Sequence, residues 1–447
     1  MNIKELLRAS RIKLIALDDD PTGIQTVHGC LLLTEWSEES LHRAFRDEAG
    51  FFYVLTNTRA MTAAQAAETT RQAMTAILEV SRSYHFRLLF VSRSDSTLRG
   101  HFPLETDIMH QVLQEFHIDT LPLTFFAPAF IEVGRLSIEG VHYLKDGDKL
   151  IPVNETEFAR DNVFAYHHAN IKDYIAEKLG TQAFGYERFA KNNNLKDLQA
   201  AIDRLTGIES AFISVDADTY ADLDNFARCL LQWMTTHAST VVLRTSSSLP
   251  KALSGIDNQP LLDKNTFCGS EQREEHQGLF IVGSHVKKST AQLVQLLQQP
   301  DTEPFELDVN DILHGSETLR LRLLSALARA DAQGLTPVVY TSRQELRLDN
   351  ADERQALGQR ISAFLVSIVE ELPYRPAWLV AKGGITSHDI LTKGLGVKQA
   401  RVMGQILAGV PCIRTGEDAR FAHLPYVIFP GNVGDENSLA EVYNKLR

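Results

Sequence analysis

Residues able to bind hydroxyls and anions follow three apolar runs in the first half of the chain. Residues 18–23 read DDDPTG, residues 56–59 read TNTR and residues 92–100 read SRSDSTLRG. An arginine guanidinium grips a carboxylate through two parallel hydrogen bonds, and Asp and Asn side chains bind hydroxyl groups. These residue types together favour a polyhydroxylated anion as the ligand, with a solvated acidic turn and separate surface ion pairs as the alternatives. The residues concerned are Asn57, Arg59, Arg93, Asp95 and Arg99.

Glycine-rich turns follow three apolar runs in the second half of the chain. Residues 283–290 read GSHVKKST, residues 382–386 read KGGIT and residues 430–435 read PGNVGD. Glycine lets the backbone approach a ligand closely, and the N–H groups at a helix N-terminus attract phosphate. None of the three turns has the residue order of a Walker A loop. Together they predict a nucleotide phosphate site, although each turn alone is also typical of an ordinary strand–helix connection.

Short apolar runs alternate with amphipathic stretches along the whole chain, which is the pattern of a largely parallel α/β sheet. In such a sheet ligands bind at the carboxyl ends of the strands, where the polar and glycine-rich turns fall. The predicted strands are residues 13–17, 51–55, 86–91, 124–127, 211–215, 240–243, 279–282, 337–340, 378–381 and 426–429. The predicted helices are residues 62–84, 218–236, 288–299, 352–371 and 386–395.

Residues 245–277 interrupt this alternation with a polar stretch that carries Pro, Gly and a run of charges, as linkers between domains often do. We therefore predict two α/β domains, each a largely parallel sheet flanked by helices, with the active site in the inter-domain cleft. The predicted domains span residues 1–250 and 277–447, and residues 251–276 form the predicted linker.

Composition excludes some classes of function. The 447 residues include 45 Lys and Arg and 57 Asp and Glu, a net charge of −12 that disfavours a nucleic-acid or membrane-surface binder. The four cysteines are scattered, with no spacing typical of a zinc site. The N-terminus is a poor signal peptide, and no apolar run approaches the ~20 residues of a membrane span. We expect a cytoplasmic protein with neither a nucleic acid nor a membrane as partner.

Seven segments together resemble the four-carbon acid sugar kinase family, which phosphorylates threonate, erythronate or 3-oxo-tetronate with ATP. The resemblance covers nearly the whole chain in the right order, and its most specific parts are the D-D-x-T-G turn and the hexapeptide DSTLRG. It implies a sugar-acid-binding domain at the N-terminus and an ATP-binding domain at the C-terminus. The segments are LDDDPTG, SDSTLRG, the AP…GR run, VDADTYADL, GSHVKKSTAQL, KGGITS and PGNVGD.

The family motifs fall on particular residues of this chain. In the first domain the matching residues are Asp19, Asp20, Thr22, Gly23 and the segment 95–100. In the second domain they are Ser284, Gly383, Gly384, Ile385, Thr386 and Gly431, which the resemblance implies bind the nucleotide. Departures from the family pattern at Pro21, Arg93, Ile385 and the PGNVGD turn indicate a divergent subgroup. They leave the identity of the four-carbon acid open more than the reaction class.

A mechanism follows as a hypothesis for this family. Arg59, Arg93 and Arg99 clamp the carboxylate of the acid, and Asp19 and Asn57 complete the substrate site. Asp20 or Asp95 accepts the proton of the terminal hydroxyl as it attacks the γ-phosphate, with Asp20 favoured. Residues 383–386 and Lys382 neutralise the phosphates, Mg²⁺ bridges them, and closure of the domains excludes water. The magnesium ligands remain unassigned, and a homodimer is expected.

Two other functions remain open at this point. A phosphatase of the haloacid dehalogenase type uses an apolar strand followed by D-x-D-x-T, and residues 17–22 satisfy that pattern with Asp18 as nucleophile. That fold also needs a Ser/Thr-ended strand, a lysine and a second acidic pair at later strand ends, and the candidates, residues 339–342 and 434–435, lie beyond the predicted linker. A sugar-acid sensor of two α/β lobes would bind the ligand without chemistry, and would not respond to ATP.

Overall fold

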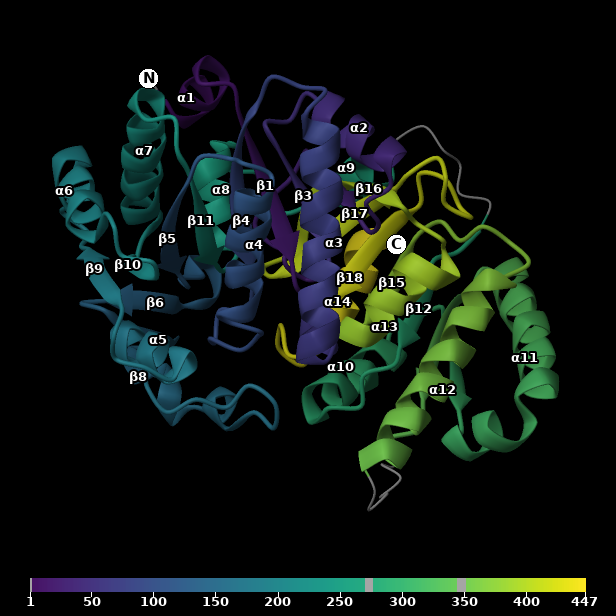
Figure 1. Ribbon diagram of the computed structural model, residues 1–447. Helices are drawn as coiled ribbons and strands as arrows, with labels where there is room; N and C mark the ends of the chain where they lie inside the picture. The colour runs from purple at the N-terminus through teal and green to yellow at the C-terminus, as the bar shows by residue number, and fades with distance from the viewer. Residues whose placement is uncertain (1, 270–275, 344–350) are drawn as a thin grey trace. The chain divides into compact units, whose positions relative to one another are not determined.

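The computed structural model describes residues 2–269, 276–343 and 351–447. Its backbone contacts divide the chain into unit 1, residues 1–258, and unit 2, residues 259–447, which Figure 1 colours from purple to teal and from green to yellow. Both are α/β units with a mostly parallel sheet flanked by helices, so the predicted fold class is confirmed.

Parallel strands build the main sheet of unit 1. All seven residues of β1 are buried, as expected for a central parallel strand covered by helices on both faces. In sheet order the strands are β2 (Leu31–Leu33), β3 (Phe51–Leu55), β1 (Ile12–Asp18), β4 (Arg87–Arg93), β11 (Thr240–Thr245), β5 (Thr120–Ala127), β10 (Ala211–Val215) and β9 (Gly185–Phe189).

Helices cover this sheet because each carries an apolar stripe. On one face α2, α3 and α4 pack on β1, β3 and β4, and Figure 1 shows α3 and α4 lying side by side. Helix α3 begins at a capping box in which Thr62 and Gln65 satisfy each other's backbone N–H groups. The helices of unit 1 are α1 (Ile3–Ala9), α2 (Glu38–Arg46), α3 (Ala63–Ser81), α4 (Leu104–Glu115), α5 (Ile171–Leu179), α6 (Leu195–Leu205), α7 (Tyr220–Thr236) and α8 (Ser248–Ser254).

A small antiparallel sheet lies in the chain between β5 and β9, and sequence reasoning missed it. Its strands are short and partly exposed, so they lack the continuous apolar runs of the main sheet. The strands are β6 (Arg135–Ile138), β7 (Val141–Asp146) and β8 (Lys149–Pro152), followed by the 3₁₀ turns η3 (Val153–Glu155) and η4 (Glu157–Arg160).

Unit 2 has its own sheet, parallel from β13 to β18 and antiparallel from β18 to β16. In sheet order its strands are β13 (Thr302–Leu307), β14 (Thr336–Thr341), β12 (Leu279–Val282), β15 (Leu379–Lys382), β18 (Pro425–Phe429), β17 (Val410–Thr415) and β16 (Gln399–Leu407). Its helices are α9 (Lys264–Cys268), α10 (Lys287–Leu297), α11 (Val309–Ala332), α12 (Ala351–Glu370), α13 (Gly384–Asp389) with a π-helical turn at Ile390–Gly394, and α14 (Ser438–Leu446).

The predicted linker, residues 251–276, contains the end of α8 and the short helix α9 in the part that the structure describes. Its remaining residues, 270–275, lie outside the described ranges. No described helix is long and apolar enough to cross a membrane.

Candidate functional site

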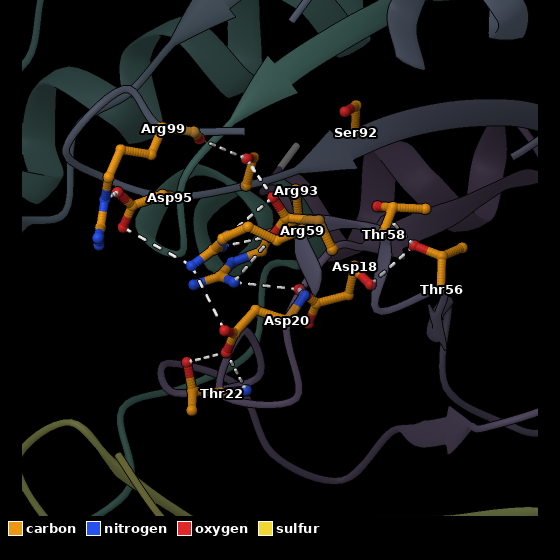
Figure 2. A network of polar contacts seen from close by, with 12 residues as sticks. Asp18, Asp20, Thr22, Thr56, Thr58, Arg59, Ser92, Arg93, Asp95 and Arg99 are labelled. Carbon is orange, nitrogen blue, oxygen red and sulfur yellow. Dashed lines mark hydrogen bonds and ion pairs between the residues drawn. The ribbon is translucent and has the colours of Figure 1, made fainter. Parts of the chain in front are cut away.

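Charged side chains of unit 1 converge where β1, β4 and β11 end. The parallel register pairs Asp18 with Arg93 and Arg93 with Thr245, so the residues that follow each strand start from one edge of the sheet. The backbone N–H groups of Thr56 and Asn57 both donate to the Asp18 carbonyl, and these two hydrogen bonds fix the loop after β3 to the end of β1. We call the resulting set the strand-end cluster: Asp18, Asp19, Asp20, Arg59, Arg93, Asp95 and Arg99, all of which except Asp19 are labelled in Figure 2.

Arg59 connects three aspartates of this cluster. Its guanidinium donates from Nε to Asp19 Oδ2 at 3.1 Å and from Nη2 to Asp19 Oδ1, a bidentate pair. Its Nη1 lies 3.4 Å from Asp20 Oδ2 and 3.9 Å from Asp95 Oδ1, and Figure 2 shows it reaching between those two carboxylates. The cation that sequence reasoning assigned to a substrate carboxylate therefore already holds protein carboxylates.

Arg93 and Asp18 form a buried ion pair beneath this layer. Arg93 Nη1 lies 3.1 Å from Asp18 Oδ1, and Nη2 donates to Ser247 Oγ at 3.0 Å. The side chains of Asp18 and Arg93 are 0% and 4% exposed, and burial raises the pKa of Asp18 to about 7 although Arg93 opposes the rise. A Cβ at Gly23 would lie 2.0 Å from Asp18 Oδ2, so the close packing of the D-D-x-T-G turn requires glycine there.

Asp95 lies on the other side of Arg59, in the DSTLRG segment. Its Oδ2 accepts from Arg99 Nε at 2.8 Å and from the Thr97 hydroxyl. Burial opposes its ionisation, but Arg59 and Arg99 together hold the pKa of Asp95 well below its usual value. Arg99 also lies 3.5 Å from the carboxylate of Asp161.

Asp20 is the carboxylate of the cluster with the most access to solvent. Its side chain is 22% exposed, against 2% for Asp19 and 13% for Asp95. Thr22 donates to Oδ1 of Asp20 from both its backbone N–H, at 2.8 Å, and its hydroxyl. Burial alone would raise the pKa of Asp20, but Arg59, Arg93 and Thr22 outweigh it and the pKa is lowered. Asp20 is therefore ionised at neutral pH, and among the described residues its Oδ2 contacts only Arg59 Nη1, at 3.4 Å.

Asn57 occupies the same edge in a left-handed conformation, with φ 53°. Its amide makes no hydrogen bond to any described residue and is half-buried, so it is available to a ligand.

A second layer, missed by sequence reasoning, supports the cluster. Arg244 Nη1 lies 2.6 Å from Glu105 Oε2, and both side chains are 6% exposed. The same guanidinium donates to Ser94 Oγ at 2.7 Å, and Ser94 in turn donates to Asp19. The sequence signal was the arginine inside the apolar run VVLRT, because a charge within a buried strand needs a buried partner.

The glycine turns of unit 2 also meet at one place. Gly383 has φ 116°, a conformation that favours glycine, and a Cβ there would lie 3.1 Å from Ser284 Cβ. A Cβ at Gly431 would lie 3.4 Å from Ser284 Oγ, while one at Gly283 would overlap Thr386 Oγ1 at 2.1 Å. Ser284, Gly383, Thr386 and Gly431 are thus packed together at one place, which we call the glycine cradle. Backbone without side chains at such a place lets a phosphate approach closely.

The other residues predicted for the nucleotide have different environments. Gly384 begins α13, and the side chain of Ile385 is 69% exposed beside it. Lys382 is fully buried, with its Nζ donating to the carbonyls of Pro430, at 2.6 Å, and Gly431, and lying over the Phe429 ring. Lys382 therefore fixes the PGNVGD turn from beneath. Lys288 is exposed in the first turn of α10 and donates to the Asn432 carbonyl at 3.2 Å.

Comparisons with known proteins agree with this division of the chain. Residues 14–253 match the family model of a sugar-binding N-terminal domain, and residues 279–439 match that of a nucleotide-binding C-terminal domain. Among solved structures, Haemophilus influenzae protein HI1011, assigned to the family DUF1537, has a TM-score of 0.68 at 16% identity over 97% of this chain and 100% of that chain. A Salmonella typhimurium LT2 protein, described as a candidate tRNA synthase, has a TM-score of 0.70 at 16% identity over 98% and 99% of the two chains. At this identity the likeness shows a shared fold. No curated protein matches the sequence significantly.

Proposed function

This chain belongs to the four-carbon acid sugar kinase family, and we propose that it is an ATP-dependent kinase that phosphorylates the terminal hydroxyl of a four-carbon sugar acid of the threonate, erythronate or oxo-tetronate type. The observation that carries the proposal is the pairing of a sugar-binding and a nucleotide-binding unit, with a charged cluster at the strand ends of the first and a glycine cradle in the second. Because the proposed reaction consumes ATP, we also propose that it takes place in the cytoplasm.

Asp20 is the proposed general base. Phosphoryl transfer needs positioning, charge neutralisation and an acceptor for the hydroxyl proton. Asp20 is ionised, partly exposed and free on one side of Oδ2, whereas Asp95 is locked by Arg99 and Thr97. Asp20 therefore accepts a hydrogen bond from the terminal hydroxyl and takes its proton, while Asp95 and Asn57 bind the other hydroxyls.

Arg93 has a supporting role in this proposal. Because it is buried and paired with Asp18, it holds the turn after β1 in place and does not reach the substrate. Arg59 and Arg99 are partly exposed, at 18% and 23%, and contribute positive charge to the site while keeping Asp20 and Asp95 ionised. Asp19 acts by fixing Arg59.

The nucleotide site uses the cradle around Ser284. The backbone of Gly383 and Gly431 and the hydroxyls of Ser284 and Thr386 approach the phosphates, and Lys288 supplies an exposed cation. Among described residues no group of three or more His, Cys, Asp or Glu side chains could hold a metal ion. In this proposal Mg²⁺ enters with ATP, because Mg²⁺ at such sites is usually held by phosphates, water and one or two carboxylates, and it would supply charge neutralisation when bound.

The alternative of a haloacid-dehalogenase-type phosphatase loses support from the position of Asp18. The nucleophile of that mechanism must contact the phosphorus, but the Asp18 carboxylate is fully buried against Gly23 and paired with Arg93.

The experiment is an ADP-release assay with a panel of four-carbon sugar acids. We expect at least one acid to stimulate ATP turnover, and an Asp20→Asn variant to lose about 100-fold or more in kcat. Asp263→Asn is the matched control, because Asp263 also accepts from both the N–H and the hydroxyl of a threonine, Thr266, but caps α9 in unit 2. Absence of any stimulation refutes the kinase, and near-normal turnover of Asp20→Asn removes Asp20 as the base.

A further inference from the structure

Five arginines surround the charged edge of unit 1, and four of them are paired. Arg59, Arg93, Arg99 and Arg244 each lie within 4 Å of at least one Asp or Glu oxygen. Arg135 has no carboxylate partner among the described residues. A substrate anion competes with existing ion pairs at the four paired arginines, so the unpaired guanidinium is the one with capacity for a new carboxylate.

Arg135 is fixed at its backbone and directed by an aromatic ring. It is the first residue of β6, and its N–H and carbonyl exchange two hydrogen bonds of 2.9 Å with Phe130. Its Nη1 donates to the Val133 carbonyl at 2.7 Å, while its Nε is buried and has no hydrogen-bond partner in the part of the chain that the structure describes. A buried N–H without an acceptor is costly, and an incoming oxygen would remove that cost.

The ring of Phe158 connects Arg135 to the strand-end cluster. The Cζ atoms of Arg135 and Arg99 lie 5.8 Å and 5.1 Å from the centroid of this one ring. Burial lowers the pKa of Arg135, and the charge of Asp95 opposes the fall, so the guanidinium lies within electrostatic reach of the cluster. The small antiparallel sheet and the turn η4 thus bring a second guanidinium beside Arg99.

We propose that Arg135 binds the carboxylate of the sugar acid and thereby makes the enzyme selective for acids over neutral polyols. The inference rests on the proposed function and specifies which end of the substrate lies where. Arg135, with Arg99 beside it on Phe158, holds the carboxylate, which leaves the hydroxyl at the far end of the chain for Asp20. In this arrangement Arg59 and Arg93 stay paired with Asp19 and Asp18, and the carboxylate of the acid binds at Arg135, the first residue of β6.

The test measures binding and turnover separately. Isothermal titration of the full chain with D- and L-threonate, D- and L-erythronate and the two 3-oxo-tetronates, without ATP, gives Kd directly. Steady-state assays with the best acid and with the neutral polyols erythritol and threitol give KM and kcat. We expect Arg135→Gln to raise Kd and KM for the acid about 10- to 100-fold, the loss of a charge-assisted contact, with kcat within about threefold. Arg135→Lys recovers part of the affinity, and KM for the polyols stays unchanged in both variants.

The control is Arg82→Gln, since Arg82 also lies over a phenyl ring, Phe116, at 5.0 Å, but caps the end of α3 before β4 begins, at the opposite edge of the sheet from the strand ends, and has no role in the proposal. Equal affinity of wild type and Arg135→Lys and Arg135→Gln for the acid overturns the inference, as does failure of the wild type to bind any of the acids. Binding that is lost in Arg135→Gln while the wild type shows no ATP turnover supports the inference and refutes the kinase. If Arg135→Gln does not fold, Arg135→Lys decides, and an unchanged Kd in that variant contradicts a bidentate carboxylate contact.

Discussion

Replacing Glu105 by glutamine tests whether the buried layer under the strand-end cluster holds the site together. In the wild type, Glu105 accepts from Arg244 at 2.6 Å and from the Thr58 hydroxyl at 2.5 Å, in surroundings where both charged side chains are 6% exposed. The substitution removes the negative charge and leaves the Arg244 guanidinium buried without a counter-charge.

The expected cost follows from that burial. Removing one partner of a buried ion pair costs about 3–5 kcal/mol, because the remaining charge stays desolvated. Arg244 also donates to Ser94, which donates to Asp19, the residue that fixes Arg59. We therefore expect Glu105→Gln to lower kcat/KM as well, through displacement of Arg59 rather than through any contact with substrate.

Hydrogen exchange followed by mass spectrometry measures the loss of stability peptide by peptide. This local measurement is needed because the two units need not unfold together. We expect peptides of β1 and β4 to exchange about 100-fold faster or more, with unit 2 unchanged. Glu115→Gln is the matched control: Glu115 also receives two arginine contacts, from Arg71 at 2.9 Å, but on an exposed helix surface where loss costs under about 1 kcal/mol. If Glu105→Gln and Glu115→Gln behave alike, the reasoning about the buried layer is wrong.

Three further outcomes are expected. Gly100→Ala should destabilise unit 1 by about 1–3 kcal/mol in the same exchange experiment, because φ is +123° and a Cβ would lie 2.6 Å from Ser94 Oγ; unchanged exchange would contradict the crowding. Burial lowers the pKa of His142 from 6.5 to about 4. Between pH 6.5 and about 4 the folded unit therefore binds fewer protons than the unfolded chain, so its free energy of unfolding falls by about 3 kcal/mol as the pH is lowered through this range. His142→Gln should flatten that part of the pH profile of Tm, and an identical profile would refute the assignment. Lys288→Met should raise KM for ATP about tenfold with KM for the acid unchanged, in the ADP-release assay; an unchanged KM for ATP would remove Lys288 from the phosphate site.

Much of the main sheets was predictable from sequence because their strands are continuous apolar runs. Strands β3, β10 and β12 begin and end at the predicted residues, and the parallel register then places the turns after β1 and β4 together. Strands with partly exposed faces were missed, including β6 to β8 and β13. The alternating burial of β16 follows a period of two that the apolar-run criterion overlooks.

The candidate site was predictable in its residues and less so in their roles. The parallel pairing of β1 with β3 brings the turns that carry Asp20 and Arg59 to one edge of the sheet. The sequence does not show that Arg59 donates to Asp19 or that Arg93 is buried. Glu105 comes from a helix, and its pairing with Arg244 depends on the packing of α4 over β11. The role of Lys382 was also not predictable. Its position before the glycine pair suggested a phosphate-binding residue, but the buried Nζ donates to the carbonyls of Pro430 and Gly431 instead.

The proposed kinase reaction is tested most directly by ³¹P and ¹³C NMR of the products formed from ATP and the four-carbon acid that binds most tightly. We predict ADP and a phosphate ester whose phosphorus couples to the terminal carbon of the acid, formed about 100-fold or more slowly when Asp20 is replaced by Asn. Inorganic phosphate as the sole phosphorus product besides ADP, an ester on another carbon, or no consumption of ATP would contradict this prediction.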